Sequence, residues 1–323
     1  MKKRIILELA FALLVFFTSC AQQQYDDEKD FEIEPVEGKG KTAHISRYTG
    51  SNQTIRIPPR IQGMTITGLG YYSFSEKEIT GITIPPRVTV IRGWAFENSK
   101  LTELILPAGL TEIGYSAFES NHLTSLVIPN SMESIGDWSF WNNRLTSLDL
   151  GNSVKKIGNY SFGLNQLTSV IIPHSVTEIG NGAFIENRLT DVTIGKNVST
   201  IGGGTFEKNL LTRITIPASV KTIGDGAFKE NQLTSVSIGE NVEFIGHHTF
   251  YNNQLTSVSI PDSVYEMGDF TFGLNKLTSI TIGNNVIIQG DTFENEFYEF
   301  YTEQECKAGT YTLNNGTWSV QFK

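Results

Sequence analysis

The side chains that can act as nucleophiles, general bases or metal ligands are few in this 323-residue chain, and none is spaced for such chemistry. The histidines and cysteines are His44, His122, His174, His247, His248, Cys20 and Cys306. Adjacent strand residues point to opposite sides, so His247 and His248 do not form a metal site. No Ser/His/Asp or Cys/His set is linked by spacing, and the glycines at 202–204 do not open a helix as a phosphate loop does. The sequence predicts no catalytic centre, metal or cofactor.

The charge balance limits the partners. The formal net charge is −9, whereas a nucleic-acid surface needs a basic stripe, so nucleic acid is not an expected partner. Two cysteines do not make a disulfide framework. Beyond the N-terminus, no apolar run reaches the roughly 18 residues that a bilayer-spanning helix needs.

The N-terminus has the features of a bacterial export signal. Residues 2–4 are basic, and the apolar run at 9–17 is too short to span a membrane. The sequence Phe-Thr-Ser-Cys at 17–20 then resembles a lipobox, which predicts a signal peptide over 1–19 and a lipid on Cys20. Cleavage without lipidation and an uncleaved anchor are the alternatives.

An acidic segment follows this cysteine. Residues 20–40 hold seven carboxylates and two lysines, so we expect a solvated tether between the lipid and the folded part. This arrangement predicts an exported outer-membrane or cell-surface lipoprotein that touches the membrane only through its lipid. A periplasmic location is the alternative.

A 22-residue unit must position every other side chain. A first copy starts at Ile79, and leucines start the others: Leu101, Leu123, Leu145, Leu167, Leu189, Leu211, Leu233, Leu255 and Leu277. Self-similarity at this period indicates a solenoid. With the leucine as column 1, columns 1, 4, 6, 10, 13 and 18 are apolar, which predicts short strands at columns 3–6 and 10–13 and a buried phenylalanine at column 18. Columns 15–20 have turn composition and predict one helical turn.

Four further columns repeat with comparable regularity. Column 14 is glycine, which indicates a positive φ or a close approach between coils. Column 21 is asparagine in eight of nine copies, and we expect its buried amide to bond the turn and the neighbouring coil. Column 2 is threonine, which is expected to bond the backbone at the bend. Column 7 alternates between proline and glycine, and since both residues end a strand, we expect either to serve the fold.

Over residues 79–294 the unit Leu-Thr-x-Val-x-Ile-Pro-x-Ser-Val-x-x-Ile-Gly-x-x-Ala-Phe-x-x-Asn-x resembles the BspA-type leucine-rich repeat. The flanking segments 57–63 and 308–312 resemble treponemal members of that family. The resemblance implies a right-handed solenoid on a bacterial surface. Relatives are associated with attachment to host matrix proteins such as fibronectin and fibrinogen and with coaggregation between bacteria, so it implies a non-enzymatic adhesin.

A repeat array needs lids at both ends. Residues 41–78 contain three strand-like runs and are expected to form an N-terminal β cap, followed by about ten coils over 79–294. Residues 295–323 are expected to form a C-terminal cap with a hairpin turning at Asn315-Gly316. Its aromatic plug over the last coil is expected from Phe297, Tyr298, Phe300 and Tyr301.

Two outward-facing sets of residues are candidate binding sites. Columns 3 and 5 should line the concave face, where hydroxyl residues accompany the aliphatic side chains of Ile105, Val127 and Ile171. A row of large aromatic residues assigned to column 16, with one from column 19, should form an edge ladder: Trp94, Tyr115, Trp138, Tyr160 and Trp141. Ordinary β-propensity and gap filling between turns are the structural alternatives.

These sets support different functions. The apolar strip favours an adhesin that binds host matrix proteins or bacterial surface proteins. The aromatic row favours a glycan-binding module. A periplasmic structural or assembly protein is the third interpretation.

Overall fold

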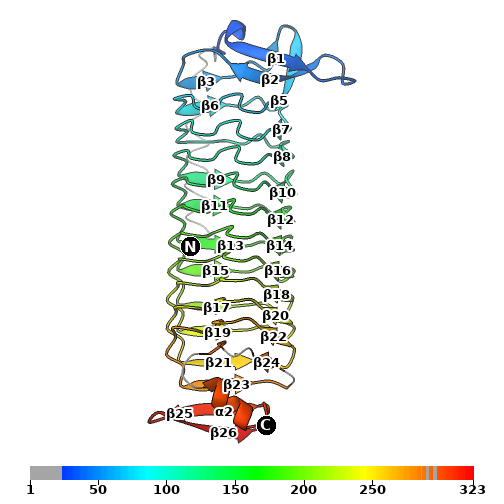
Figure 1. Cartoon of the computed structure of the whole chain (residues 1–323). Coiled ribbons are helices and arrows are strands. Elements are labelled where there is room, and N and C mark those ends of the chain that lie inside the picture. The colour runs from blue at the N-terminus through cyan, green and yellow to red at the C-terminus, as the bar shows by residue number, and fades with distance from the viewer. Residues whose placement is uncertain (1–23, 285, 289–290, 294–296) are drawn as a thin grey trace, which may run out of the picture.

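The computed structural model describes residues 24–323 except 285, 289–290 and 294–296. Figure 1 shows one column of stacked coils with a cap at each end. The column has about 11 turns, parallel strands and little helix. The predicted leucine-rich repeat solenoid is therefore confirmed, whereas Cys20 and the predicted signal peptide lie outside the described residues.

Most coils contribute two short strands, which form two rows along two sides of the column (Figure 1). The coil that starts at Leu101 has a strand only in the second row. The first row comprises β6 (Gly81–Thr83), β9 (Ser125–Val127), β11 (Ser147–Asp149), β13 (Ser169–Ile171), β15 (Asp191–Thr193), β17 (Arg213–Thr215), β19 (Ser235–Ser237), β21 (Ser257–Ile260) and β23 (Ser279–Ile282). The second row comprises β7 (Val90–Ile91), β8 (Glu112–Ile113), β10 (Ser134–Ile135), β12 (Lys156–Ile157), β14 (Glu178–Ile179), β16 (Thr200–Ile201), β18 (Thr222–Ile223), β20 (Phe244–Ile245), β22 (Glu266–Met267) and β24 (Ile287–Ile288). Paired residues lie 22 positions apart, as Leu126 and Leu148 do. Both predicted strand positions are confirmed.

The first row is hydrogen-bonded in pairs of coils. β9 pairs with β11, β13 with β15, β17 with β19 and β21 with β23. In the second row, by contrast, the eight strands from β10 to β24 form one sheet, while β7 and β8 continue the sheet of the N-terminal cap. In each pair the first coil has proline at column 7 and the second has glycine. A Cβ on Gly239 would lie only 2.5 Å from the carbonyl oxygen of Pro217. The strands end before both residues, as expected, but a side chain does not fit at Gly239, so proline could not replace glycine there.

The interior is filled by the six apolar columns. Phe184 is fully buried, and its ring stacks between Phe162 and Phe206 at centroid distances of 5.5 and 5.6 Å. Similar stacking continues from Phe74 to Phe293. Column 18 is therefore interior, as predicted, and each such ring contributes about 1.5–3 kcal/mol by leaving water.

The segment at columns 15–20 forms overlapping β-turns, so the predicted helical turn is wrong. The N–H of Ala183 bonds the carbonyl of Gly180, and the N–H of Ile185 bonds that of Gly182. Columns 16 and 20 have positive φ in successive coils, for example 60° at Gly182 and 52° at Glu186. A left-handed residue interrupts the right-handed helical path.

Three of the small and polar columns stabilise the stack. Column-14 glycines have no positive φ, but a Cβ on Gly136 would lie 2.5 Å from the Ile113 carbonyl oxygen, so close approach is their reason. The amide of Asn187 donates to Phe162 and Phe184 of two neighbouring coils, as expected. At several bends the hydroxyl group of a column-2 threonine donates to a backbone carbonyl of the preceding coil. These threonines are Thr102, Thr146, Thr190, Thr234 and Thr278.

The N-terminal cap begins earlier than expected. It contains η2 (Glu28–Asp30), β1 (Phe31–Pro35), β2 (Thr42–Tyr48), β3 (Thr54–Arg56), β4 (Arg60–Ile61) and β5 (Met64–Leu69). β1 pairs antiparallel with β2, and Phe31 is buried against Tyr48. The tether assigned to 20–40 is therefore wrong for this part, because Phe31 and Ile33 alternate with acids that face water.

The first coil also lies inside the segment assigned to this cap. β5 pairs parallel with β7, and Phe74 stacks on Phe96 at 4.9 Å. The segment that ends at residue 78 therefore contains one coil in addition to those of the array that starts at Ile79.

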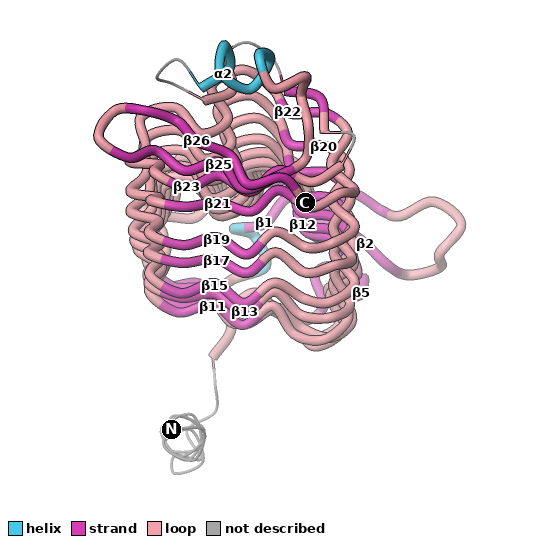
Figure 2. Tube along the Cα trace, turned by 90° about the horizontal axis from the view of Figure 1, so that it is seen from below, coloured by secondary structure: helices cyan, strands magenta, loops and turns pink. Residues whose placement is uncertain are grey.

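The C-terminal cap contains α2 (Phe297–Glu303), β25 (Gly309–Asn314) and β26 (Thr317–Phe322). Phe297 and Tyr301 are buried, whereas Tyr298 is exposed and does not belong to the plug. The hairpin turns at Asn315 and Gly316, which both have positive φ. β25 pairs antiparallel with β23 and so covers the end of the first strand row (Figure 2).

Candidate functional site

Columns 3 and 5 point outward from the first strand row. In β9 and β13 the central residue is buried and both its neighbours are exposed. Three aliphatic side chains of column 5 are strongly exposed, with Ile105 at 77 %, Val127 at 56 % and Ile171 at 71 %. Asp149, which pairs with Val127 in the next coil, interrupts them. The three residues, here called the apolar strip, lie on a surface rich in serine and threonine.

The aromatic residues gather at the turn edge of the column in two clusters. Tyr72 stacks on Trp94 at 5.0 Å, and Tyr115 lies tilted against Trp94 at 5.1 Å. Further along, Trp138 stacks on Tyr160 at 4.4 Å. Trp141 packs edge-on against both members of this second pair.

The expected single ladder is therefore wrong. Tyr115 lies in column 15, and column 16 of that coil is the buried Ser116, which separates the two clusters. Tyr72 was missed because its coil was assigned to the cap, although its position 22 residues before Trp94 is a sufficient signal.

The backbone under these aromatics is unusual. Trp94, Trp138 and Tyr160 have φ of 56°, 59° and 55°, a region that bulky residues rarely adopt. The corresponding residues of the next three coils are glycines: Gly182, Gly204 and Gly226. Because glycine has no Cβ, it adopts this conformation without the strain of about 1–3 kcal/mol. The chain thus carries aromatics where its own repeats show that glycine suffices.

These three glycine coils leave a hollow at the turn edge. It has a volume of about 500 Å³, with Tyr160 and Ile185 at one end and Glu207 and Asp225 at the other. A second hollow of about 250 Å³ shares those two acids and reaches His248. Together they form one recess, here called the glycine hollow, that follows directly on the second aromatic cluster.

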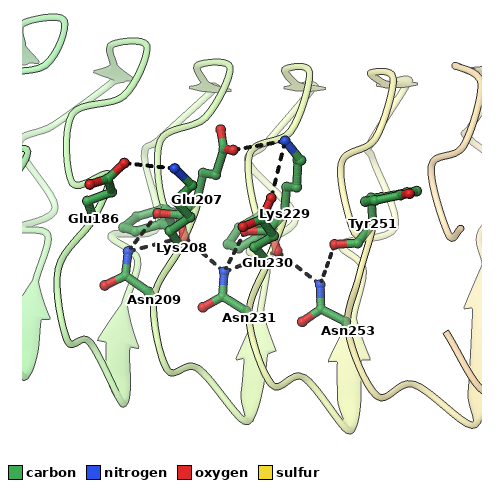
Figure 3. Close-up of polar contacts among 11 residues, drawn as sticks. Glu186, Glu207, Lys208, Asn209, Lys229, Glu230, Asn231, Tyr251 and Asn253 are labelled. Carbon is green, nitrogen blue, oxygen red and sulfur yellow. Dashed lines mark hydrogen bonds and ion pairs between the residues drawn. The ribbon is translucent and has the colours of Figure 1, made fainter. Parts of the chain in front are cut away.

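The recess is lined by two carboxylates, Glu207 and Asp225, and by one lysine, Lys229. Figure 3 shows Lys229 reaching Glu207, with an Nζ–Oε1 distance of 3.1 Å, above the ladder of asparagine side chains. That hydrogen bond is the main reason why the pKa of Lys229 is raised. The second carboxylate oxygen of Glu207, Oε2, lies 3.3 Å from the place where a Cβ on Gly204 would be.

The histidines of the array take part in the hydrogen bonding between coils. His247 Nδ1 accepts from the backbone N–H of Asp269 at 2.9 Å, and His174 Nδ1 accepts from that of Lys196 at 3.2 Å. Within the described residues, no three His, Cys, Asp or Glu side chains are placed to hold a metal. Cys306 is an exposed free thiol. A helix of the length and apolarity needed to cross a membrane is not found in the described part of the chain.

Two stretches, residues 67–189 and 177–299, match the model of the BspA type leucine rich repeat region, with six copies. Together they span well over half of the chain. The chain belongs to the BspA-type leucine-rich repeat family. In this BspA-type protein the matched region starts at residue 67, before Ile79, in agreement with the additional coil around Phe74.

Several solved structures are similar to this chain. The pneumococcal vaccine antigen PcpA is 23 % identical with a TM-score of 0.56, and the match covers 79 % of this chain and 80 % of that one. A leucine-rich repeat protein from Bacteroides ovatus is 20 % identical with a TM-score of 0.47, covering 82 % and 90 %. The leucine-rich repeat protein of T. pallidum is 22 % identical with a TM-score of 0.41, covering 79 % and 91 %. At these identities the likeness to PcpA concerns the fold alone. A search of curated protein sequences found no significant match.

Proposed function

We propose that this BspA-type protein is an exported, surface-held binding protein whose apolar strip engages protein partners, either host extracellular matrix proteins or proteins on other bacteria. The observation that carries the proposal is the exposure of Ile105, Val127 and Ile171, which all stand at column 5 of their coils. Protein interfaces are depleted of charge at their core, and the three side chains of the strip are uncharged. Membership of a repeat family that presents extended surfaces supports the same role.

The test is saturable binding of the purified protein to immobilised fibronectin, fibrinogen and other matrix proteins, and to whole bacteria. The variant Ile105→Thr/Ile171→Thr places in column 5 the residue found there at Thr193 and Thr215, so the strand should be retained. We expect it to weaken binding by tenfold or more. Ile287→Thr is the matched control, because Ile287 is 60 % exposed but lies outside the strip. Absence of saturable binding to every ligand would remove the proposal.

A second candidate function is glycan binding by the turn edge. The specific observation is that Trp94 and Trp138 occupy left-handed backbone positions that glycine fills elsewhere in the chain. Exposed aromatic faces stack on sugar rings. A glycan array probed with the wild type, Trp94→Gly and Trp138→Gly tests this candidate, and a signal unchanged by both substitutions would eliminate it.

The anchoring is a separate part of the proposal. Cys20 would carry the lipid, so labelling with a fatty-acid analogue should be lost in Cys20→Ala. Brief protease treatment of intact cells should remove the protein if it faces outward. Protection of the chain in intact cells, with cleavage after lysis, would favour the periplasmic alternative.

A further inference from the structure

The glycine hollow is a gap in two side-chain ladders at once. In column 16 the aromatic stack stops at Tyr160, and Gly182, Gly204 and Gly226 follow. A Cβ on Gly182 would overlap the Tyr160 ring, so that ring already covers Gly182. At Gly204 the nearest atoms to a Cβ are Glu207 Oε2 at 3.3 Å and Ile185 Cδ1 at 4.0 Å. The position of the next ring in the stack is therefore open.

Column 15 is interrupted in the same coil. Its side chains normally accept a hydrogen bond from the backbone N–H of the next coil, as Asn159 does from Asn181 and Asn181 from Gly203. Gly203 has no side chain, and the N–H of Asp225 consequently has no partner among the described residues. The ladder resumes at Asp225, which accepts from His247 at 2.8 Å. The donor that the preceding column-15 side chain satisfies at Asn181, Gly203 and His247 is thus left open at Asp225, which lines the hollow.

Other polar groups around the gap also have unused capacity within the described chain. Glu207 is engaged by Lys229 through Oε1, while its Oε2 has no hydrogen-bond partner. The Nδ2 group of Asn181 is likewise unpaired, unlike that of Asn159, which bonds Asp137. The hollow therefore presents two donors, the Asp225 N–H and the Asn181 amide, and a carboxylate acceptor, beside the apolar wall of Tyr160 and Ile185.

We propose that the glycine hollow is a binding subsite for a neutral pyranose, whose ring occupies the empty place in the aromatic stack. A sugar ring has an apolar face for Tyr160 and Ile185, and hydroxyl groups that both donate and accept for Glu207, Asn181 and Asp225. A partner's aromatic side chain has at most one polar atom and would leave several of these groups unpaired. An anionic sugar or phosphate would meet the Glu207 and Asp225 carboxylates. The inference rests on the second proposed function, glycan binding by the turn edge.

The experiment titrates the purified protein with the methyl glycosides of glucose, galactose, mannose, N-acetylglucosamine and N-acetylgalactosamine. Tryptophan fluorescence and saturation-transfer NMR are the two readouts, since Trp138 and Trp141 pack against Tyr160. We expect saturable binding of at least one glycoside. Binding should be at least tenfold weaker in Tyr160→Gly and in Glu207→Gln, and an anionic sialic acid glycoside should not bind.

Two substitutions fill the gap with residues that the repeat already accepts. Gly204→Phe places a ring at a residue that lines the hollow, with a φ that Phe270 already adopts in its own coil. Gly203→Asn restores the column-15 acceptor, with the Asp225 carbonyl oxygen 3.0 Å from the new Cβ. Both should abolish glycoside binding, whereas Phe270→Gly, which removes a ring of the same column outside the hollow, should not change it.

The outcomes separate this subsite from the wider glycan proposal. Glycoside binding that survives Gly204→Phe, in a variant with wild-type circular dichroism, would overturn the subsite. So would competition by an aromatic peptide without any glycoside binding. If glycan binding depends on Trp94 and not on Tyr160 or Glu207, the proposal of glycan binding by the turn edge is supported and the proposed subsite in the hollow is refuted. If no glycan binds at all, both fail.

Discussion

The asparagine of column 21 is the side chain on which the stacking of neighbouring coils depends most directly. Asn187 is 7 % exposed. Its Nδ2 donates to the carbonyls of Phe162 at 2.9 Å and Phe184 at 3.2 Å, and its Oδ1 accepts from the N–H of Leu167 at 3.0 Å. Each of these carbonyls also accepts from a second asparagine, Phe162 from Asn165 and Phe184 from Asn209, whereas the Leu167 N–H has no other partner among the described residues. Removal of the amide therefore strands one buried donor and takes one of two hydrogen bonds from each carbonyl.

The magnitude follows from these three bonds. A buried hydrogen bond contributes about 1 kcal/mol net, and a stranded buried group costs about 1–3 kcal/mol. Asn187→Ala should therefore lower the free energy of unfolding by about 3–5 kcal/mol. Asn187→Ser should lose less, about 1–3 kcal/mol, because the chain already uses serine here. Ser99 occupies column 21 of an earlier coil and donates to the Phe74 carbonyl at 2.7 Å.

Urea unfolding monitored by circular dichroism measures the loss, and hydrogen exchange locates it. Faster exchange should appear first in the coils on either side of residue 187, because each coil contacts only its neighbours. A loss below about 1 kcal/mol for the alanine variant, in the range of ordinary surface substitutions, would refute the reasoning. Equal losses for alanine and serine would show that the bond to the preceding coil does not matter.

Three further outcomes are expected. Phe184→Ala should cost about 3–5 kcal/mol in urea unfolding, with adjacent coils loosening before distant ones; a loss below about 1 kcal/mol would contradict its interior role. Trp138→Gly should change thermal stability little, since relief of about 1–3 kcal/mol of backbone strain offsets about 0.5–1.5 kcal/mol for each lost ring contact; a large drop in melting temperature would make the ring structural. Burial, with Glu119 and Glu76 nearby, raises the pKa of Glu97 above its ordinary value of 4.5. The stability linked to neutral Glu97 is present below pH 4.5 and lost as pH rises through the raised pKa, so Glu97→Gln should melt at a higher temperature near neutral pH and show no such advantage in acid; a pH-independent difference would contradict this.

Much of the fold was predictable because each column is sampled about ten times within one chain. A position that is phenylalanine in coil after coil, such as Phe184, is assigned to the interior by repetition, without an alignment. The same holds for Asn187, whose recurrence in an otherwise turn-like segment indicated a backbone-bonding role. The period also fixed the register, so the pairing of residues 22 apart followed directly.

Predictions failed where a residue's own preference differs from the conformation that the stack imposes. Tryptophan and tyrosine rarely adopt positive φ. Trp138 and Tyr160 therefore do not indicate a left-handed turn in the sequence, which predicts a helical turn instead. The acids around Phe31 suggested a solvated tether, although the period-two alternation with Ile33 is that of an edge strand. The acidic composition of residues 20–40 as a whole hid the alternation of apolar and acidic residues in the five-residue strand β1.

The candidate sites show the same division. Exposure of Ile105 and Ile171 followed from strand alternation. The glycine hollow did not, although Gly203 and Gly204 are plain in the sequence. Reading it requires two facts from the structure: that a column-16 ring covers the following coil, and that a column-15 side chain bonds the next N–H. Glycine is frequent at the turns of this chain. The sequence alone therefore does not indicate that the glycines at 203 and 204 leave a hollow, because this depends on what the column-15 and column-16 side chains of neighbouring coils contact.

The pairing of coils in the first strand row connects the architecture with the variability of the sites. Strands bond within a proline–glycine pair but not as a ladder between pairs, and several column-2 threonine bonds, such as Thr190 to Thr168, also join the two coils of one pair. The structural unit is thus 44 residues, and a chain that lengthens by whole pairs keeps every such bond intact. Among the described residues, the side chains of columns 5 and 16 take no part in these bonds within a pair. They can change from Ile171 to Thr193, or from Tyr160 to Gly204, while the scaffold persists, which is the freedom that a binding surface requires.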